Sequence, residues 1–338
     1  MADGDSTDPT EPVRSGQAWL LLLLPPLVPL LGAAAILQFI THPELSPANL
    51  TGAFAEGRDV LGRHMADRMI YAAAGFFHIV VCLGAIVYFL DGLRRMPTPL
   101  RRRGHLYILA ALVVLTLTVV LLRAPQLDFA VYKLTYVNIR EILRLSLAEA
   151  DLTRYVVGDF TKLSILVYIP TLFGMVAVIT AAALATAAAG ELPRRSDGEW
   201  RRQFVVRVRM LQQAFYVLSA VLVTSTITIM LFFQLPVALA GDDATRMALS
   251  AYAQGLTAFW GTVFTLTLIA TFVPATLILR HRAQRYRERL KAPQEFQTWL
   301  TDQVPVTVEK QIRNLAAMFA PLIIGLLGNV LQSVVRFG

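Results

Sequence analysis

Charged residues are scarce in this chain of 338 residues, and cysteine is almost absent. Only 16% of the residues are Asp, Glu, Lys or Arg, and 56% are hydrophobic, whereas ordinary soluble domains are about 25% charged and about 45–50% apolar. This composition argues against a soluble enzyme with a single core. It favours an all-α polytopic membrane protein.

The one cysteine, Cys82, lies inside an apolar run. A single cysteine excludes an intrachain disulfide and says nothing about the compartment. It also excludes a cluster of thiolate ligands, and the sequence has no HExxH, GxSxG, Walker phosphate loop, GxGxxG or zinc-spaced Cys/His set. The sequence therefore predicts no catalytic residue, no metal and no cofactor.

Long apolar runs, by contrast, are abundant. A helix needs about 20 apolar residues to cross the hydrocarbon core, and the segments that qualify are 17–41, 70–90, 105–122, 163–189, 212–240 and 252–279. Residues 1–16 are acidic and rich in Pro, Ser and Asp, which is typical of a disordered tail. We therefore expect a six-helix transmembrane domain over residues 17–279.

Loop charge orients the predicted bundle. Loops 91–104 and 190–211 and the stretch 280–313 are rich in arginine, whereas the intervening loops carry basic and acidic residues in similar numbers. Because basic loops are retained on the cytoplasmic side, this alternation predicts a cytoplasmic N-terminus and a basic cytoplasmic segment at 280–313. We expect the chain to lie in the lipid bilayer of the cytoplasmic membrane. The net charge of +8 follows from this topology, so no specific nucleic acid is predicted as a partner.

Residues 314–338 contain a further apolar segment, LAAMFAPLIIGLLGNVLQSVV. Its length suits a seventh crossing; a re-entrant helix or a helix on the inner surface is the alternative, because proline and glycine interrupt it. Small or polar residues recur in it every four positions, at Ala317, Pro321, Gly325, Asn329 and Ser333. This stripe favours packing against another membrane helix. The predicted bundle thus has six to seven transmembrane helices.

Three helical features are expected beyond the spans. The stretch YVNIREILRLSLAEADLTRY is rich in helix formers, and its periodicity places Ile139, Ile142 and Leu143 towards the bundle and Arg140, Glu141 and Arg144 towards water. On the cytoplasmic side, DGEWRRQFVVRVRMLQQ should run directly into segment 212–240. RHRAQRYRERLK should extend segment 252–279 into the cytosol.

Polar side chains inside the spans define the candidate sites. No acid, lysine or arginine lies in the middle of a predicted span, which weakens an ion-coupled transporter. His78 is a candidate intramembrane polar site: a haem ligand, a proton site, or a neutral histidine bonded to a neighbouring helix. Hydroxyls gather further along the chain, where Thr224 and Thr228 share one helix face and Thr267 and Thr271 share another. They could line a permeation path, or join helices through hydrogen bonds.

Three classes of function are compatible with these features. The leading expectation is a non-enzymatic transport- or channel-type protein with the hydroxyl seam between segments 212–240 and 252–279. The alternative is a membrane sensor, effector or scaffold subunit that binds a cytosolic protein partner through the basic segments 191–211 and 280–313. A membrane-embedded enzyme acting on lipid has the least support. Each class is compatible with a homo-oligomer.

Overall fold

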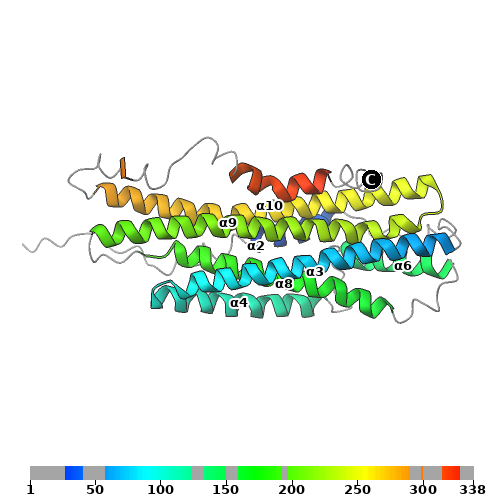
Figure 1. The fold of residues 1–338 in the computed structure, drawn as a ribbon, viewed down its shortest axis with the longest axis horizontal. Helices are drawn as coiled ribbons and strands as arrows, with labels where there is room; N and C mark the ends of the chain where they lie inside the picture. The colour runs from blue at the N-terminus through cyan, green and yellow to red at the C-terminus, as the bar shows by residue number, and fades with distance from the viewer. Residues whose placement is uncertain are drawn as a thin grey trace, which may run out of the picture.

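The computed structural model describes residues 27–40, 58–122, 133–149, 159–191, 197–288, 298–299 and 314–327. Over these residues the chain is a bundle of long helices lying side by side (Figure 1). In chain order the elements are α2 (Leu27–Ile40), α3 (Arg58–Arg94), α4 (Thr98–Leu122), the π-helix η2 (Lys133–Val137), α6 (Asn138–Glu149), α8 (Asp159–Ala188), α9 (Asp197–Gln234), the 3₁₀-helix η3 (Leu235–Leu239) and α10 (Asp243–Glu288). A further apolar helix, Asn314–Leu327, is called the C-terminal helix below. The predicted tail at 1–16 lies outside the described residues.

Among the described residues, four helical stretches are long and apolar enough to cross a membrane: His64–Arg94, Ile165–Ala188, Gly198–Leu239 and Asp243–Arg287. They indicate an integral membrane protein and confirm the predicted all-helical class. The count of six to seven crossings stays a prediction.

α9 and α10 are longer than the spans predicted within them. α9 begins at Asp197 and α10 continues to Glu288, so the helical continuation predicted for both segments is confirmed as far as Glu288, and its place in the cytosol stays a prediction. α10 has 46 residues, which at about 1.5 Å per residue gives roughly 69 Å, over twice the thickness of the hydrocarbon core. Part of α10 must therefore lie outside the hydrocarbon core.

α3 and α9 are antiparallel. Tyr88, late in α3, donates a hydrogen bond to Gln213 of α9 at 3.0 Å, and His78, a few turns earlier in α3, lies 2.8 Å from Thr224, later in α9. The end of the bundle at which α3 ends and α9 begins is called the basic end, because its arginines are numerous. The other is called the α6 end.

α3 and α8 are parallel. The Tyr71 hydroxyl donates to the Leu166 carbonyl at 3.2 Å, and a Cβ on Gly92 would lie 3.0 Å from the Leu184 side chain. α2 belongs with this alternating pattern, because Leu37, near its end, is part of the core at the α6 end. These directions are the ones that the predicted topology requires.

A proline in α8 explains the Tyr71 contact. Pro170 lies inside the helix and has no N–H, so the carbonyl four residues earlier loses its usual helical partner. That carbonyl belongs to Leu166, and it accepts the hydrogen bond from Tyr71. Membrane helices tolerate proline where a neighbouring helix satisfies the freed group in this way.

Two apolar cores occupy the two ends of the bundle. The core at the basic end is built on the alanine-rich second half of α8, in which residues 181–189 are all buried. Small side chains here allow close helix packing, and Gly190 lies so near Leu100 that an added Cβ would clash with that side chain. The core at the α6 end joins α6, η2 and η3 to the ends of α9 and α10.

α6 packs as its periodicity predicts. Ile139 is 1% exposed and Leu143 is fully buried, whereas Glu141 lies on the outer face between two arginines. The Glu141 carboxylate accepts hydrogen bonds from Arg144 at 2.8 Å and Arg140 at 3.1 Å. Partial burial would raise the pKa of Glu141, but these bonds and the two positive charges outweigh it and lower the pKa.

α10 begins with a side-chain cap. The Asp242 carboxylate accepts hydrogen bonds from the Thr245 amide at 2.7 Å and from the Thr245 hydroxyl at 2.8 Å. Aspartate is a favoured N-cap because its oxygens satisfy amides that have no partner in the first helical turn. These bonds, the one from the Thr245 amide above all, lower the pKa of Asp242.

The C-terminal helix docks on α9 and α10 through the predicted small-residue stripe. The Ser219 hydroxyl donates to the Ala317 carbonyl. A Cβ on Gly261 would lie 2.7 Å from the Pro321 carbonyl oxygen, and a Cβ on Gly325 would lie 2.9 Å from the Thr257 carbonyl oxygen. These backbone approaches confirm the stripe at 317, 321 and 325. Asn329 and Ser333, with the rest of the predicted seventh span, lie outside the described residues.

Candidate functional site

His78 lies where α3, α8 and α9 meet, and it is 2% exposed. Its Nδ1 atom is 2.8 Å from the Thr224 hydroxyl, and its Nε2 atom is 3.3 Å from the Ser225 hydroxyl. His78, Thr224 and Ser225 are called the polar node below. The node joins α3 to α9 within an otherwise apolar part of the bundle, and α8 packs against it.

The hydrogen bonds of the Thr224 hydroxyl indicate which ring nitrogen of His78 carries the proton. The Thr224 hydroxyl is also placed to donate to the Val221 carbonyl, at 2.9 Å. A hydroxyl has one proton, so when Thr224 donates to Val221 its oxygen accepts a proton from Nδ1–H of His78. Nε2 is then the acceptor for Ser225. This arrangement satisfies both ring nitrogens of a neutral imidazole.

Cys82 contacts the histidine ring but is not placed as a metal ligand beside it. The Cys82 sulfur lies 3.4 Å from Nε2 and 3.7 Å from Nδ1. A sulfur along the lone-pair direction of Nε2 would be much farther from Nδ1, because that direction points away from the ring and from Nδ1. The nearly equal distances therefore place the sulfur beside the ring, away from the direction in which a metal would bind.

A glycine in α8 makes room for the histidine. A Cβ added to Gly174 would lie 3.2 Å from Nε2 of His78 and 3.5 Å from the Ser225 hydroxyl. A larger residue would force the ring to move. Gly174 is one contributor to the site that the sequence did not indicate, because one glycine in an apolar span carries no signal of its neighbours.

The predicted threonine seam divides into two pairs on different contacts. Thr228 donates to the Thr224 carbonyl at 2.9 Å and lies 3.5 Å from the Ala74 carbonyl of α3. Thr267 and Thr271 each donate to a carbonyl four residues earlier in α10, at 2.8 and 2.7 Å. Thr228, Thr267 and Thr271 are buried, and Thr224 is half-buried.

The helix register separates these two pairs. Phe215 of α9 packs edge-on against Phe272 of α10, which brings Thr271 near the level of Phe215. By the same antiparallel register Thr267 is level with residue 220 of α9, so at the usual helical rise Thr224 lies about 6 Å from the level of Thr267 and about 12 Å from that of Thr271. The structure therefore joins Thr224 to His78 and brings Thr228 close to the Ala74 carbonyl of α3, whereas Thr267 and Thr271 bond within α10, one to two turns nearer the basic end than Thr224. Whether either pair serves transport stays a prediction.

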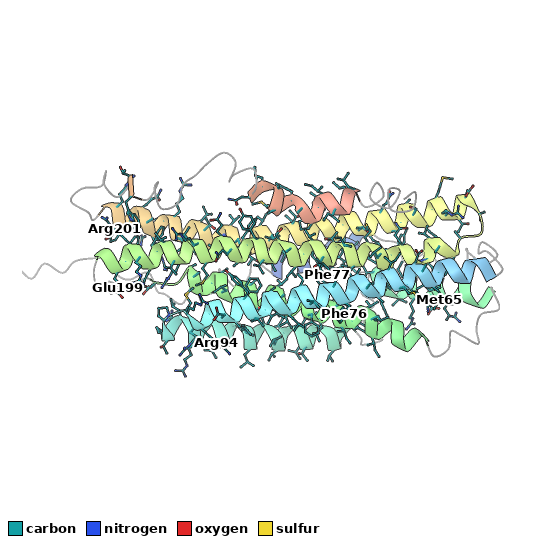
Figure 2. All side chains as sticks on the ribbon, in the orientation of Figure 1. Met65, Phe76, Phe77, Arg94, Glu199 and Arg201 are labelled. Carbon is teal, nitrogen blue, oxygen red and sulfur yellow. The ribbon has the colours of Figure 1, made fainter. Side chains whose placement is uncertain are left out.

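A small cleft lies beside the node on the outside of the bundle. Its volume is about 110 Å³, and its lining comes from Gly75, Phe76 and Ile79 of α3 and from Ile165 and Ile169 of α8 beside Pro170. Phe76 is 70% exposed and projects from the middle of α3 (Figure 2). In a membrane this surface faces lipid tails.

A buried arginine at the basic end was not anticipated from the sequence. Arg207 of α9 is 3% exposed, and its guanidinium donates to the carbonyl of Gly190 at 2.6 Å and of Glu191 at 3.2 Å, with Ala188 at 3.4 Å. α8 ends at Ala188, where the last carbonyls have no helical partner, so Arg207 closes this end of the helix, chiefly through the two carbonyls beyond it. Val206 and Val208 flank this arginine, and apolar neighbours on both sides are the one sequence feature that indicates its burial.

Aromatic rings join α9 and α10 beyond this cap. Trp200 stacks on Tyr286 with ring centroids 3.8 Å apart and on Phe204 at 5.2 Å. The Arg201 guanidinium lies over the Trp299 ring, 5.4 Å from its centroid. Glu199 and Arg201 mark this outermost part of the bundle in Figure 2.

No known protein family, curated protein or solved structure matches this chain. The described residues define a class by their fold alone: they form an all-helical bundle in which four helices are suited to crossing a membrane, which indicates an integral membrane protein.

Proposed function

We propose that this chain is a membrane sensor, effector or scaffold subunit that binds an acidic cytosolic protein through the projecting ends of α9 and α10. The observation that carries the proposal is the length of this projection. Tyr88 is level with Gln213, so the end of α3 at Arg94 is level with residue 207 of α9. α9 starts ten residues earlier, which leaves about 15 Å of helix beyond α3.

Figure 1 is consistent with this register, since the ends of α9 and α10 project beyond those of α4 and α8. We call residues 197–206 and 283–288 the stalk. A membrane anchor has no need of it, because about 20 apolar residues suffice to cross. The stalk therefore supports a role at the cytosolic surface.

Charge and rigidity both suit the stalk to binding. Arg202, Arg285 and Arg287 are exposed on it, and such a basic surface favours acidic partners and speeds their association. The stacked rings of Trp200, Phe204 and Tyr286 hold the two helices together. A surface ordered before binding loses less conformational entropy when a partner docks.

Site-specific cross-linking in native membranes tests this proposal. A photo-cross-linking amino acid in place of Arg202 should capture a discrete cytosolic protein, and Arg285→Glu should abolish the product. The matched control is Arg246→Glu at the α6 end, which should leave the product unchanged. Persistence of the product in the Arg285→Glu protein would contradict the proposal, and so would the lack of any product at Arg202.

Transport is the second candidate, and the polar node favours it. His78 and the hydroxyls of Thr224 and Ser225 lie together between three apolar helices, where polar groups are costly and often functional. Purified protein in vesicles should then pass small solutes or ions, and Thr224→Val with Thr228→Val should reduce the flux. Thr262→Val with Thr276→Val, on exposed positions of α10, is the matched control. Equal flux through the two variants would show that the polar node does not line the transport pathway.

A further inference from the structure

Arginines from four helices converge at one level of the basic end. They are Arg94 of α3, Arg101 and Arg102 of α4, Arg209 of α9 and Arg280 of α10. We call these five residues the arginine belt. All are exposed except Arg101, which is half-buried. The belt is distinct from the stalk, whose arginines lie further out at the basic end, earlier in α9 and later in α10.

Contacts between helices place the belt residues at a common level. Gly104 of α4 packs so close to Leu93 that its Cβ would stand 2.6 Å from that side chain, and Arg101 and Arg102 lie within one turn of Gly104. Gln213 is level with Tyr88, so Arg209, one turn before Gln213, is level with Gly92 and two residues from the level of Arg94 along the axis.

α10 reaches the same level. Phe272 packs against Phe215, so the antiparallel register brings Arg280 level with residue 207 of α9. Arg209 lies two residues from that point, or about 3 Å along the axis. The belt residues of α4, α3, α9 and α10 thus lie at one level of the bundle.

The belt begins where lipid-facing apolar surface stops. Val87 on α3, Leu106 on α4 and Leu277 on α10 are 66%, 58% and 57% exposed, and each lies within about two turns of a belt arginine. Large exposed apolar side chains on three helices are expected against lipid tails. Arginine just beyond them reaches the headgroups, because its stem can lie along apolar surface while its charged group stays at the interface.

Charge pairing differs between the two ends of the bundle. At the α6 end, Arg140 and Arg144 pair with Glu141, and Arg246 pairs with Asp243. In the part of the chain that the structure describes, none of the five belt arginines forms an ion pair; near them, Asp91 pairs with Arg95. Their guanidinium groups are therefore free to bind an external anion. Guanidinium binds phosphate oxygens in a two-pronged geometry.

We propose that the arginine belt binds the phosphodiester groups of anionic phospholipids, whose acyl chains lie on the adjoining apolar surface. Position fixes the source of the phosphate as lipid, because the belt borders the lipid-facing band on three helices. The proposal does not rest on the stalk, so either can fail alone. It also differs from the general retention of positive charge on one side of the membrane, because it specifies selectivity between lipids in purified protein.

Native mass spectrometry of the full chain, released from nanodiscs of phosphatidylcholine and phosphatidylglycerol in equal amounts, tests the proposal. The unmodified protein should retain phosphatidylglycerol over phosphatidylcholine. A variant carrying R94Q, R102Q, R209Q and R280Q should lose at least tenfold of this preference, since one basic residue near an anionic membrane surface contributes about fivefold.

The control variant removes four arginines outside the belt, through R144Q, R202Q, R246Q and R285Q. It should keep the preference within twofold. Equal losses in the two variants would indicate a general effect of net charge and would overturn the proposal, as would a belt variant that retains its preference. If the fourfold belt variant does not fold, the single changes R209Q and R280Q should each reduce the preference, and no reduction in either would also overturn it.

Discussion

Replacing Arg207 by methionine should destabilise the protein more than any neighbouring arginine change. The side chain is 3% exposed, and its guanidinium contacts the carbonyls of Ala188, Gly190 and Glu191. Methionine has a similar length but no donor. The substitution therefore leaves the end of α8 without its cap while largely filling the space.

The expected loss follows from the hydrogen bonds and the helix dipole. A hydrogen bond from a charged donor contributes about 1.5–3 kcal/mol, and a cation at a helix C-terminus about 0.3–1 kcal/mol. Removing the charge also removes the desolvation cost of a buried ion, which offsets part of the loss. We therefore expect a net decrease of about 2–3 kcal/mol in the free energy of unfolding.

Unfolding in mixed detergent micelles, followed by tryptophan fluorescence, measures this loss, because Trp200 lies in the same core. Arg209→Met is the control: Arg209 is exposed, and a surface change typically alters stability by less than about 0.5 kcal/mol. Arg207→Lys should fall between them, because lysine keeps the charge but loses the planar fork. If Arg207→Met and Arg209→Met unfold at the same denaturant concentration, the capping argument is wrong.

Three further outcomes are expected. Gly261→Leu should destabilise the docked C-terminal helix by about 1–3 kcal/mol through overpacking, whereas Gly255→Leu, with nothing within 4 Å of an added Cβ, should unfold like the unmodified protein; equal stability of the two variants would refute the close contact. The bonds that cap α10, chiefly from the backbone amide three residues on, lower the pKa of Asp242; the stability it adds is thus complete above its unfolded pKa and is lost as the pH falls through its folded pKa. Hydrogen-exchange protection of the first turn of α10 should fall over that range relative to Asp242→Asn, and parallel profiles would contradict the cap. With Cys82 replaced, an impermeant maleimide added outside cells should label a cysteine at Ala244 but not one at Thr98, and labelling at Thr98 would overturn the predicted topology.

Periodicity and apolar length predicted the parts of the fold that depend on one segment alone. The continuation of α9 and α10 beyond the basic ends of their predicted spans, the buried face of α6 and the packing of the stripe at 317, 321 and 325 all follow from patterns within one stretch of sequence. Such repeats identify which face of a helix is buried, because side chains three or four positions apart share a face. They do not identify the helix that covers it.

The features that the sequence did not predict all depend on register between helices. The sequence allowed His78 to contact a neighbouring helix, but only the relative positions of α3 and α9 select Thr224 and Ser225. The four threonines looked like one seam because spacing within each helix was known and the offset between the helices was not. Tyr71 and Leu166 illustrate the same point, since a freed carbonyl is predictable from Pro170 but its donor is not.

The segment from the short connection after η3 to Gly261 of α10 has a fixed length, because it joins a capped helix start to a helix-docking surface. Three residues separate η3 from α10, and each residue of an α-helix turns the chain by about 100°. One residue inserted early in α10, before the Gly261 contact, would rotate the docking surface relative to Asp242 by that angle. Either the capped first turn or the seat of the C-terminal helix would then be lost. We therefore expect related chains to vary in length in the connections on the cytoplasmic side and to keep the number of residues between Asp242 and Gly261 constant.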